Sequence, residues 1–444
     1  MGYASAAENL QLLDQDGFLN EPGEQTMKTN IGILFSVLAL LSLFACEDYV
    51  SNVEPYNDRL VSEALNTERN VPALIVGVDN QVAWTVDDLF MGADGLSDQL
   101  IFDTRNPMST YPGYQMLDEG DPLDYRDENA QPFDNSHELR VLADTLLYRV
   151  LNSVAFTRAT LKDSALFSGY FHSAYAYYLI ATYYGRGPTD GGSPINLGHF
   201  VPSAKLYQTA LDRWNESLKY TTDAYRIRLV NSLMARLYLF IGNYTNAAAC
   251  AAKGLVSPDA PWLAKYDLVN DNEYRGGAGE VRDQLMVDPR FNAYVVADST
   301  EAKRIKIKKK TGTGGWVFYS EIKYVQTGTT VTPIELMDWQ ENNLMRAELA
   351  VRGASSDNAL TLINAVRTSQ GVSTLPTGTV ITLSDPKTST TYSIFEERDK
   401  ALFIRGLRLP DQRRFNKWHL AAGTWKYMPI SLAEKQRNPY WGTE

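Results

Sequence analysis

Apolar residues recur at helical spacing through the middle of the chain. In residues 139–154, leucine and valine return every three or four positions, which is the pattern of an amphipathic helix that packs on one face. Residues 163–184 and 206–220 repeat this pattern, and a Gly-Arg-Gly-Pro sequence at residues 185–188 ends the first of the two. The pattern therefore predicts consecutive amphipathic helices and a mainly α chain.

Two segments show the spacing of small and aromatic residues that is typical of tetratricopeptide hairpins. In residues 227–255, alanine, glycine and tyrosine follow at intervals that let two antiparallel helices approach while tyrosine fills the gap. Residues 342–367 repeat the spacing, and residues 163–220 form a third, degenerate pair. Because other segments interrupt the array, we expect hairpins at about 139–258 and 340–370 and no free-standing solenoid.

Three segments break the helical pattern. Residues 92–136 are rich in Gly, Asp, Pro and Asn, which predicts a long surface loop. Residues 259–335 contain short β-like runs at 291–297 and 316–324, and residues 371–393 have hairpin character. We expect these insertions to sit together on one face of the helical scaffold, as a loop-rich, partly β region that carries the binding function.

The N-terminus has the pattern of a lipoprotein signal. Residues 27–45 contain a short basic start and then an apolar stretch, and Cys46 follows directly. The apolar stretch is shorter than the about 20 residues that a membrane span needs. Acylation of Cys46 with two chains would give a stable membrane anchor. The alternative is an ordinary signal peptide with a chance cysteine, because Phe44 is not the usual small residue. Residues 1–26 are polar and are interpreted as an over-extended start, so the mature chain spans residues 46–444.

The net charge of −11 narrows the range of partners, since phosphate binding requires a basic face. Nucleic acid and anionic membrane surfaces are therefore not expected. The basic run at residues 303–310 (KRIKIKKK) is interpreted as a strand edge or solvated loop in preference to a phosphate site. The two cysteines exclude a disulfide framework and a zinc site, and Cys250 is expected to be a buried small residue.

No catalytic, metal or cofactor motif is found in the chain. The four histidines are scattered, and neither a nucleophile elbow nor a phosphate-binding loop occurs. Glycosidase carboxylates cannot be recognised from sequence, because their separation is a tertiary property. The sequence Glu396-Glu397-Arg398 is interpreted as a capping and ion-pair cluster at a helix start.

Aromatic residues on irregular segments are the candidates for ligand binding. A sugar ring packs its apolar face on Trp or Tyr, while Asp, Asn and Arg hydrogen-bond to its hydroxyl groups. Each candidate residue on its own could instead serve a structural role. A cluster of candidates from both segments in one cleft would favour ligand binding. The candidates are Trp84, Phe90, Asp94 and Asp98 beside the first predicted loop, Tyr111 and Tyr114 within it, and Trp316 and Tyr319 on the glycine-rich insertion.

The C-terminal part of the chain resembles the SusD/RagB family of outer-membrane nutrient-binding lipoproteins. That family ends in a pattern of Glu-Arg, Gly, Arg, Asp and Arg, followed by Pro-Ile and Asn-Pro. The matching positions are Glu397, Arg398, Gly406, Arg408, Asp411, Arg414, Pro429, Ile430, Asn438 and Pro439. The helical pair matches at Arg346, Ala347, Glu348, Arg352, Ala359, Leu360, Ile363, Asn364, Val366 and Arg367.

Four positions depart from the family pattern. Ala401 and Arg405 stand where acidic residues are usual, Gln412 replaces Leu, and Ser431 replaces Pro. We expect these changes to weaken the salt-bridge network of the motif without changing the fold, as in a divergent member.

The resemblance implies a function as well as a SusD-like fold. Such proteins bind an oligosaccharide or another nutrient and act as the lid of a TonB-dependent (SusC-like) outer-membrane transporter, without catalysis. The acidic residues after Cys46 resemble the surface-export signal of Bacteroidetes-type lipoproteins, which implies lipid anchoring at the cell surface. Two other functions remain open: a tetratricopeptide-type protein–protein adaptor of the envelope, and a lipid-anchored glycoside hydrolase with two facing carboxylates.

Overall fold

The computed structural model describes residues 62–121 and 127–443. The expected signal peptide and Cys46 lie outside these residues. The chain forms two units, and η1 (Ser62–Leu65) is the described part of the first, which covers residues 1–65. The second unit, residues 66–444, holds every feature discussed below. Within the described residues, no helix combines the length and apolarity that a membrane span needs.

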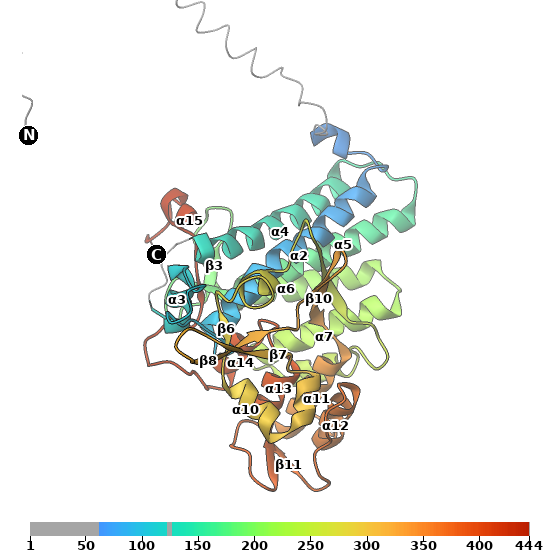
Figure 1. The fold of residues 1–444 in the computed structure, drawn as a ribbon. Helices are drawn as coiled ribbons and strands as arrows, with labels where there is room; N and C mark the ends of the chain where they lie inside the picture. Colours follow the sequence, from blue (N-terminus) through green and yellow to red (C-terminus); the bar gives the residue numbers. More distant parts are fainter. Residues whose placement is uncertain (1–61, 122–126, 444) are drawn as a thin grey trace, which may run out of the picture. The chain divides into compact units, whose positions relative to one another are not determined.

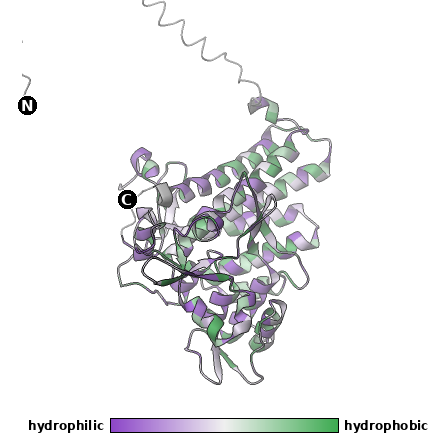
Figure 2. Ribbon diagram, viewed as in Figure 1, coloured by the Kyte–Doolittle hydropathy of each residue, from purple (hydrophilic) through white to green (hydrophobic). Residues whose placement is uncertain are grey.

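Long helices packed side by side form the first half of the large unit (Figure 1). Figure 2 shows that these helices are rich in hydrophobic residues, and α5 is buried from Ala165 to Tyr183 except at Tyr170. These helices are α2 (Val71–Leu96), α4 (Asp127–Asn152), α5 (Ala159–Tyr183) and α6 (Ser203–Ser217), followed by η2 (Leu218–Tyr220), α7 (Ala224–Phe240) and α8 (Tyr244–Ala251). At the α7–α8 turn, Gly242 has a φ of +75° and the Asn243 side chain caps α8, which explains the Gly-Asn sequence.

A second group of helices follows the insertion. It consists of α11 (Trp339–Val351), α12 (Ala359–Ser369), α13 (Ile394–Ala401), α14 (Arg408–Arg414) and α15 (Leu432–Arg437). Asp338 and Asn358 cap α11 and α12 by accepting backbone N–H groups, so local sequence defines both helix starts. Residues of α11, α12 and α13, with Leu407 and Phe415 on either side of α14, share a small core of their own beside the main one.

Short strand pairs connect the helices. The antiparallel pairs are β1 (Leu100–Ile101) with β6 (Met286–Val287), β3 (Gly192–Pro194) with β4 (Phe200–Pro202), and β7 (Ile307–Thr311) with β8 (Val317–Glu321). A three-stranded sheet has the order β5 (Trp262–Asp267), β10 (Thr330–Met337), β9 (Gln326–Thr327). The pairs β11 (Val380–Thr382) with β12 (Thr391–Ser393) and β2 (Tyr184–Gly185) with β13 (Met428–Pro429) are parallel. The remaining elements are α3 (Pro112–Glu119), α9 (Glu273–Gly277), α10 (Arg290–Ala297) and η3 (Ser299–Lys303).

The predicted fold class is confirmed: the chain is mainly α, with helical hairpins and a partly β insertion region. The tyrosine-rich composition is explained by packing, since several of the largest fully buried side chains are tyrosines of α5 and the residue after it. Lys308 to Lys310 lie in strand β7, as expected for a strand edge. Cys250 is half-buried at the edge of the core.

The expected loop at residues 92–136 is largely helical. Helix α2 continues to Leu96 through Gly92 and Gly95, because these glycines sit in tight contacts and not in a turn. A Cβ atom on Gly92 would lie 2.8 Å from the Met428 methyl group, and one on Gly95 would lie 3.2 Å from Leu285. The glycines therefore allow close helix packing.

Two strand predictions also need correction. Residues 291–297 form α10, because the Asp288 side chain accepts the Arg290 N–H at the start of the helix and Phe291 anchors it in the core. Residues 371–393 contain no antiparallel hairpin: β11 and β12 pair in parallel, and Ser373 hydrogen-bonds to Thr300 of η3. This third insertion therefore packs against α12 and α13, while β1 and β6 join the first two insertions.

Candidate ligand-binding site

The C-terminal half of α2 carries two of the predicted site residues, Phe90 and Asp94, in structural positions. Phe90 is buried, with its ring centroid 5.8 Å from that of Tyr183. Gly406 packs on the same ring: its φ is +71°, and a Cβ atom there would lie 2.6 Å from Phe90. Phe90 therefore serves the core and does not face a ligand site.

Asp94 is fully buried and holds the C-terminal motif in place. One carboxylate oxygen accepts hydrogen bonds from the Tyr274 hydroxyl at 2.5 Å and from the Gly406 amide at 3.1 Å. Burial raises the pKa of Asp94 to about 7, although both hydrogen bonds oppose this shift. Asp94 thus connects α2 to the motif instead of contacting a ligand.

Asp98 has a similar structural role. It forms ion pairs with Arg290 at 3.0 Å and with Arg408 at 2.7 Å, and both arginines also pair with Asp399. Trp84, by contrast, is exposed, but it lies within helix α2 and not on a loop. These four residues of α2 and its C-terminal end therefore do not form one site.

The loop after β1 presents an exposed tyrosine. The Tyr111 side chain is 43% exposed, whereas Tyr114, one turn into α3, is buried. The Arg282 guanidinium lies 4.9 Å from the Tyr111 ring centroid and donates to the Met108 carbonyl at 3.1 Å. Arg282 thereby fixes both the loop and the aromatic ring.

The β7–β8 hairpin places its aromatic residues on two faces. Because side chains alternate along a strand, Trp316 and Phe318 point one way and Tyr319 points the other. Trp316 and Phe318 stack with centroids 4.8 Å apart, and the Arg105 guanidinium lies 4.6 Å from the Trp316 ring. Trp316 and Tyr319, which were predicted together, are therefore separated by the hairpin.

The structure brings Tyr111 and Trp316 to one surface through the segment between α9 and β6. Asp283 follows Arg282, and its carboxylate accepts from Ser320 of β8 and from Lys310 of β7, the latter at 2.7 Å. Its backbone carbonyl accepts from Asn106 of the loop at 2.8 Å. We call this surface the aromatic–arginine face; it consists of Arg105, Tyr111, Arg282, Trp316 and Phe318.

Sequence reasoning missed both arginines of this face. Arg105 and Arg282 are 177 positions apart and belong to no recognisable motif. The pairing of β1 with β6 and the hydrogen bond from Asn106 to the Asp283 carbonyl bring their segments together.

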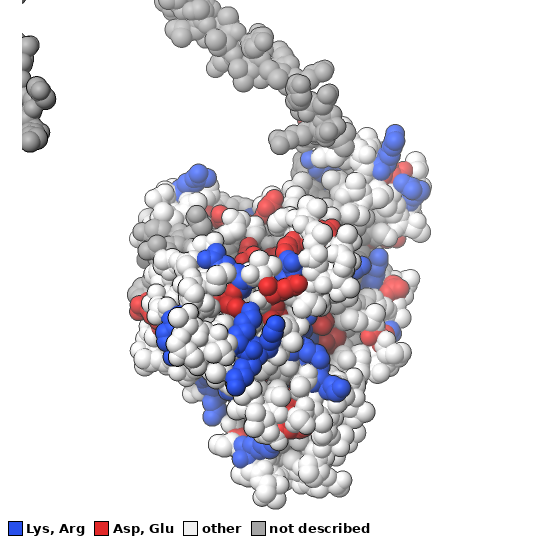
Figure 3. Space-filling model, in the orientation of Figure 1, with Lys and Arg blue, Asp and Glu red and all other residues white. Residues whose placement is uncertain are grey.

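The other face of the hairpin lines a pocket. Tyr319 and Lys309 form a cross-strand pair on this side, and Ile305, Ile307, Val295 and Lys306 complete much of the wall of a cavity of about 380 Å³. A second cavity of about 360 Å³ shares Lys306. Figure 3 shows Lys and Arg side chains gathered over this part of the molecule, although the chain as a whole is acidic.

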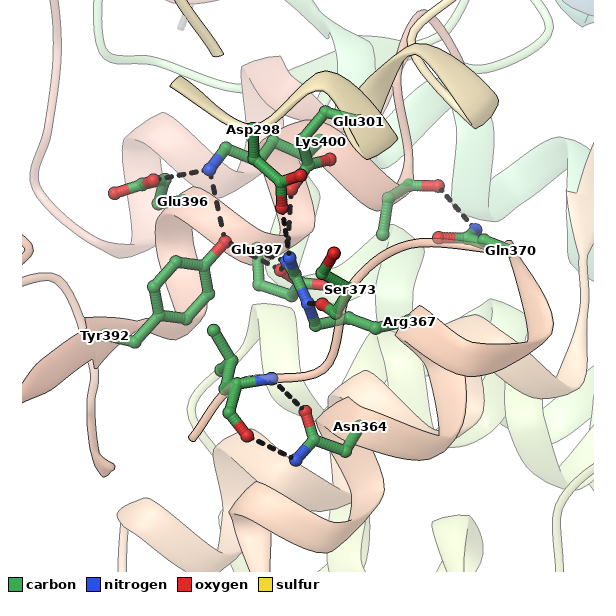
Figure 4. A network of polar contacts seen from close by, with 12 residues as sticks. Asp298, Glu301, Asn364, Arg367, Gln370, Ser373, Tyr392, Glu396, Glu397 and Lys400 are labelled. Carbon is green, nitrogen blue, oxygen red and sulfur yellow. Dashed lines mark hydrogen bonds and ion pairs between the residues drawn. The ribbon is translucent and has the colours of Figure 1, made fainter. Parts of the chain in front are cut away.

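The motif residues of the C-terminal part form a buried ion-pair network (Figure 4). Glu397 accepts from Arg304 at 2.7 Å and from Arg367 at 2.9 Å, and the Tyr392 hydroxyl donates to it at 2.7 Å. Burial opposes ionisation of Glu397, but Arg304 and Arg367 outweigh it and lower its pKa to about 2. The expected ion-pair role of this cluster is confirmed, but the cap of α13 is the Ser393 hydroxyl, which accepts the Glu396 N–H, and not a side chain of the cluster.

The expected weakening of this network does not occur at Arg405. Its guanidinium pairs with Asp338 at 2.8 Å and donates to the Glu335 carbonyl at 2.9 Å. Further along the motif, Asp411 pairs with Arg398 at 2.7 Å and Arg414 at 2.8 Å. The departure from the family pattern therefore supplies an additional buried ion pair instead of removing one.

Carboxylates near Trp84 have raised pKa values but do not form a metal site. Burial raises the pKa of Asp88 to about 6 and that of Glu273 to about 8, and Asp88 adds to the shift of Glu273. Across residues 62–121 and 127–443, no group of three or more His, Cys, Asp or Glu side chains could hold a metal ion.

The comparisons with known proteins identify the fold. No family model matches the chain, and no curated protein matches it by sequence. Solved structures do match. Surface glycan-binding protein A from Bacteroides thetaiotaomicron is 13% identical with a TM-score of 0.63, over 86% of this chain and 98% of that one. A laminarin-binding SusD-like protein is 15% identical with a TM-score of 0.60, over 83% and 97% of the two chains.

A third structure gives the same result. The SusD-like carbohydrate-binding protein from Bacteroides vulgatus is 15% identical with a TM-score of 0.58, over 79% of this chain and 83% of that one. The chain therefore has the SusD-like fold over most of its length, and the predicted resemblance to the SusD/RagB family is confirmed at the level of the fold.

Proposed function

We propose that this chain is a non-catalytic, glycan-binding member of the SusD/RagB family that uses the aromatic–arginine face to contact its ligand. The observation that carries the proposal is the convergence of Tyr111 and Arg105 from the first insertion with Arg282 and the β7–β8 hairpin from the second. This convergence occurs on a fold whose solved examples include a surface glycan-binding protein in complex with laminarihexaose.

The chemistry of the face suits an oligosaccharide. Tyr111 offers a partly exposed ring for the apolar face of a sugar, and the Arg105 side chain, 65% exposed, offers several N–H donors for hydroxyl groups. Trp316 lies under Arg105, and the Asp103 carboxylate accepts hydrogen bonds from its guanidinium, so both residues hold Arg105 in place. Arg282 does the same for Tyr111, so the face is ordered before a ligand arrives, which lowers the entropic cost of binding.

The proposal also covers the location of the chain in the cell and its protein partner. We place the mature chain at the outer-membrane surface, anchored through lipid on Cys46, where it acts as a lid that delivers its ligand to a TonB-dependent, SusC-like transporter. The sequence motifs of the signal and of the C-terminal part support this placement.

A binding experiment tests the glycan-binding function. The chain from residue 47 onward is titrated by calorimetry with a panel of neutral and acidic oligosaccharides that includes laminarihexaose, and each mixture is analysed for new reducing ends. Binding without hydrolysis is expected. Newly formed reducing ends would instead support the hydrolase, and no binding to any glycan in the panel would overturn the proposal.

Variants then locate the site. Tyr111→Ala and Arg105→Ala should each weaken binding by about tenfold, the equivalent of about 1.4 kcal/mol. Tyr148→Ala is the matched control, because Tyr148 is 63% exposed on α4 and has no part in the face. Equal affinities for all four proteins would move the site away from the aromatic–arginine face.

A further inference from the structure

The basic run at residues 303–310 is concentrated in an otherwise acidic chain. Lys303, Lys306, Lys308 and Lys309 are all exposed. Figure 3 shows the resulting positive surface in this region. Strand-edge lysines prevent edge-to-edge aggregation, which would account for a lysine anywhere along β7. That explanation does not account for which side of the strand each lysine occupies.

Strand alternation sorts the lysines of β7 into two sets. Lys309 is directly opposite Tyr319 and shares its side of the hairpin, where the cavity of about 380 Å³ lies. Lys308 is opposite Ser320, whose hydroxyl donates to Asp283 on the other side. Only one of these two neighbouring lysines therefore lines the cavity.

Lys306 precedes the strand and lies where two cavities adjoin. It lines the cavity with Tyr319 and Lys309, and it also lines the cavity of about 360 Å³ that contains Lys303. Three lysines spaced three residues apart, Lys303, Lys306 and Lys309, thus line two adjoining hollows.

The other cations of these cavities are already paired. Lys323 pairs with Glu335 at 3.1 Å, Arg405 with Asp338, and Arg304 with Glu397. Among the residues that the structure describes, no carboxylate forms an ion pair with Lys303, Lys306 or Lys309. Lys303, Lys306 and Lys309 therefore bring ammonium groups to the walls of the two cavities without a paired carboxylate among the described residues.

We infer that these adjoining cavities bind an acidic oligosaccharide, whose carboxylate or sulfate groups pair with Lys306 and Lys309 while a sugar ring packs on Tyr319. The inference rests on the proposed glycan-binding function; it names the class of glycan and places the acidic groups on the side of the β7–β8 hairpin opposite to the aromatic–arginine face. A neutral ligand over these cavities would strip water from the ammonium groups without replacing their counter-charge, which is unfavourable. An acidic ligand supplies that charge through strong, charge-assisted hydrogen bonds.

The experiment uses a matched pair of ligands. The chain from residue 47 onward is titrated with an oligogalacturonate and with the same oligomer after its carboxyl groups have been reduced, at low and at physiological salt. A sulfated oligosaccharide is a second acidic probe, and polyglutamate is an anion without sugar. We expect the acidic saccharides to bind at least about tenfold more tightly than the reduced oligomer, and their affinity to fall as salt rises.

Variants of equal charge locate the contact. Lys306→Gln and Lys309→Gln should each weaken binding of the acidic probes by about three- to tenfold, and Tyr319→Ala should weaken it as well. Lys253→Gln is the matched control, since it removes the same charge from an exposed lysine that lines neither cavity and lies outside the aromatic–arginine face, and it should change affinity less than about twofold. A free energy of unfolding within error of the parent for each variant shows that the fold is intact.

The possible outcomes separate this inference from the function on which it rests. Equal binding of the reduced and the acidic oligomers, or equal weakening by Lys253→Gln and Lys309→Gln, would overturn the acidic-glycan inference and leave glycan binding standing. If polyglutamate binds as tightly as the acidic saccharides, the cavities form a general anion-binding surface, and the acidic-glycan inference is overturned. If neither neutral nor acidic glycans bind, the proposed function fails together with the inference.

Discussion

Asp94 of α2 accepts a hydrogen bond from the backbone amide of Gly406 at 3.1 Å, across 312 positions of sequence. The contact joins the first long helix of the fold to the motif near its end. It also explains why the motif requires glycine, since Gly406 has a φ of +71° and packs directly on Phe90.

The first prediction concerns Gly406→Ala. The added Cβ atom would lie 2.6 Å from the Phe90 ring, in a backbone conformation that is unfavourable for alanine. The two effects together should lower the free energy of unfolding by about 2–4 kcal/mol, as measured by urea denaturation. Gly423→Ala is the control: its φ is +94°, but nothing lies within 4 Å of the new Cβ atom, so only the smaller backbone cost should appear.

The second prediction concerns pH. Burial raises the pKa of Asp94 to about 7, above its value in the unfolded chain, so the folded state holds a proton that the unfolded state has released. The contribution of Asp94 is therefore most favourable below about pH 4 and is lost as pH rises towards 7. Asp94→Asn should remove this decline. The slope of the free energy of unfolding against pH should then change by up to about 1.4 kcal/mol per pH unit. Parallel curves for parent and variant between pH 5 and 7 would contradict the assignment.

The third prediction concerns the buried network around Glu397. Glu397→Gln removes the charge that compensates Arg304 and Arg367, and should lower the free energy of unfolding by about 3–5 kcal/mol at neutral pH. Because the pKa of Glu397 is lowered to about 2, its stabilisation is present above about pH 4.5 and is lost as pH falls towards 2. The difference between the parent and the variant should therefore shrink in acid. Glu216→Gln, in an exposed pair with Lys219, should have no measurable effect.

The fourth prediction concerns the membrane anchor. Cys46→Ala removes the predicted lipid attachment site, so the full-length protein should move from the membrane pellet to the soluble fraction on cell fractionation. Cys250→Ala is the control and should stay with the membrane. If Cys46→Ala still pellets with the outer membrane in cells that lack the transporter, the anchor assignment is wrong.

Part of the candidate site could be predicted from sequence. Two candidate residues, Phe90 and Asp94, were misplaced for the same reason. Tyr111 and Trp316 were candidates because they are aromatic residues on irregular segments; both lie on the proposed face, and their contact with a ligand stays a prediction. Phe90 and Asp94 were misplaced because glycine at positions 92 and 95 was interpreted as a loop signal, whereas there it permits close packing within a helix. The sequence alone does not distinguish a glycine in a loop from a glycine that permits close packing of a helix.

The sequence by itself determined the helices between residues 139 and 255, the helical pair at residues 342–367 and the resemblance carried by the C-terminal motif. These features depend on residues close together along the chain, where helical periodicity and capping act locally. Only the tertiary structure decided what each polar residue does. Arg105 meets Trp316, Asp94 meets Gly406, and the two sides of β7 separate Lys308 from Lys309. These relationships depend on strand pairing and long-range packing, which bring together residues that no local pattern connects.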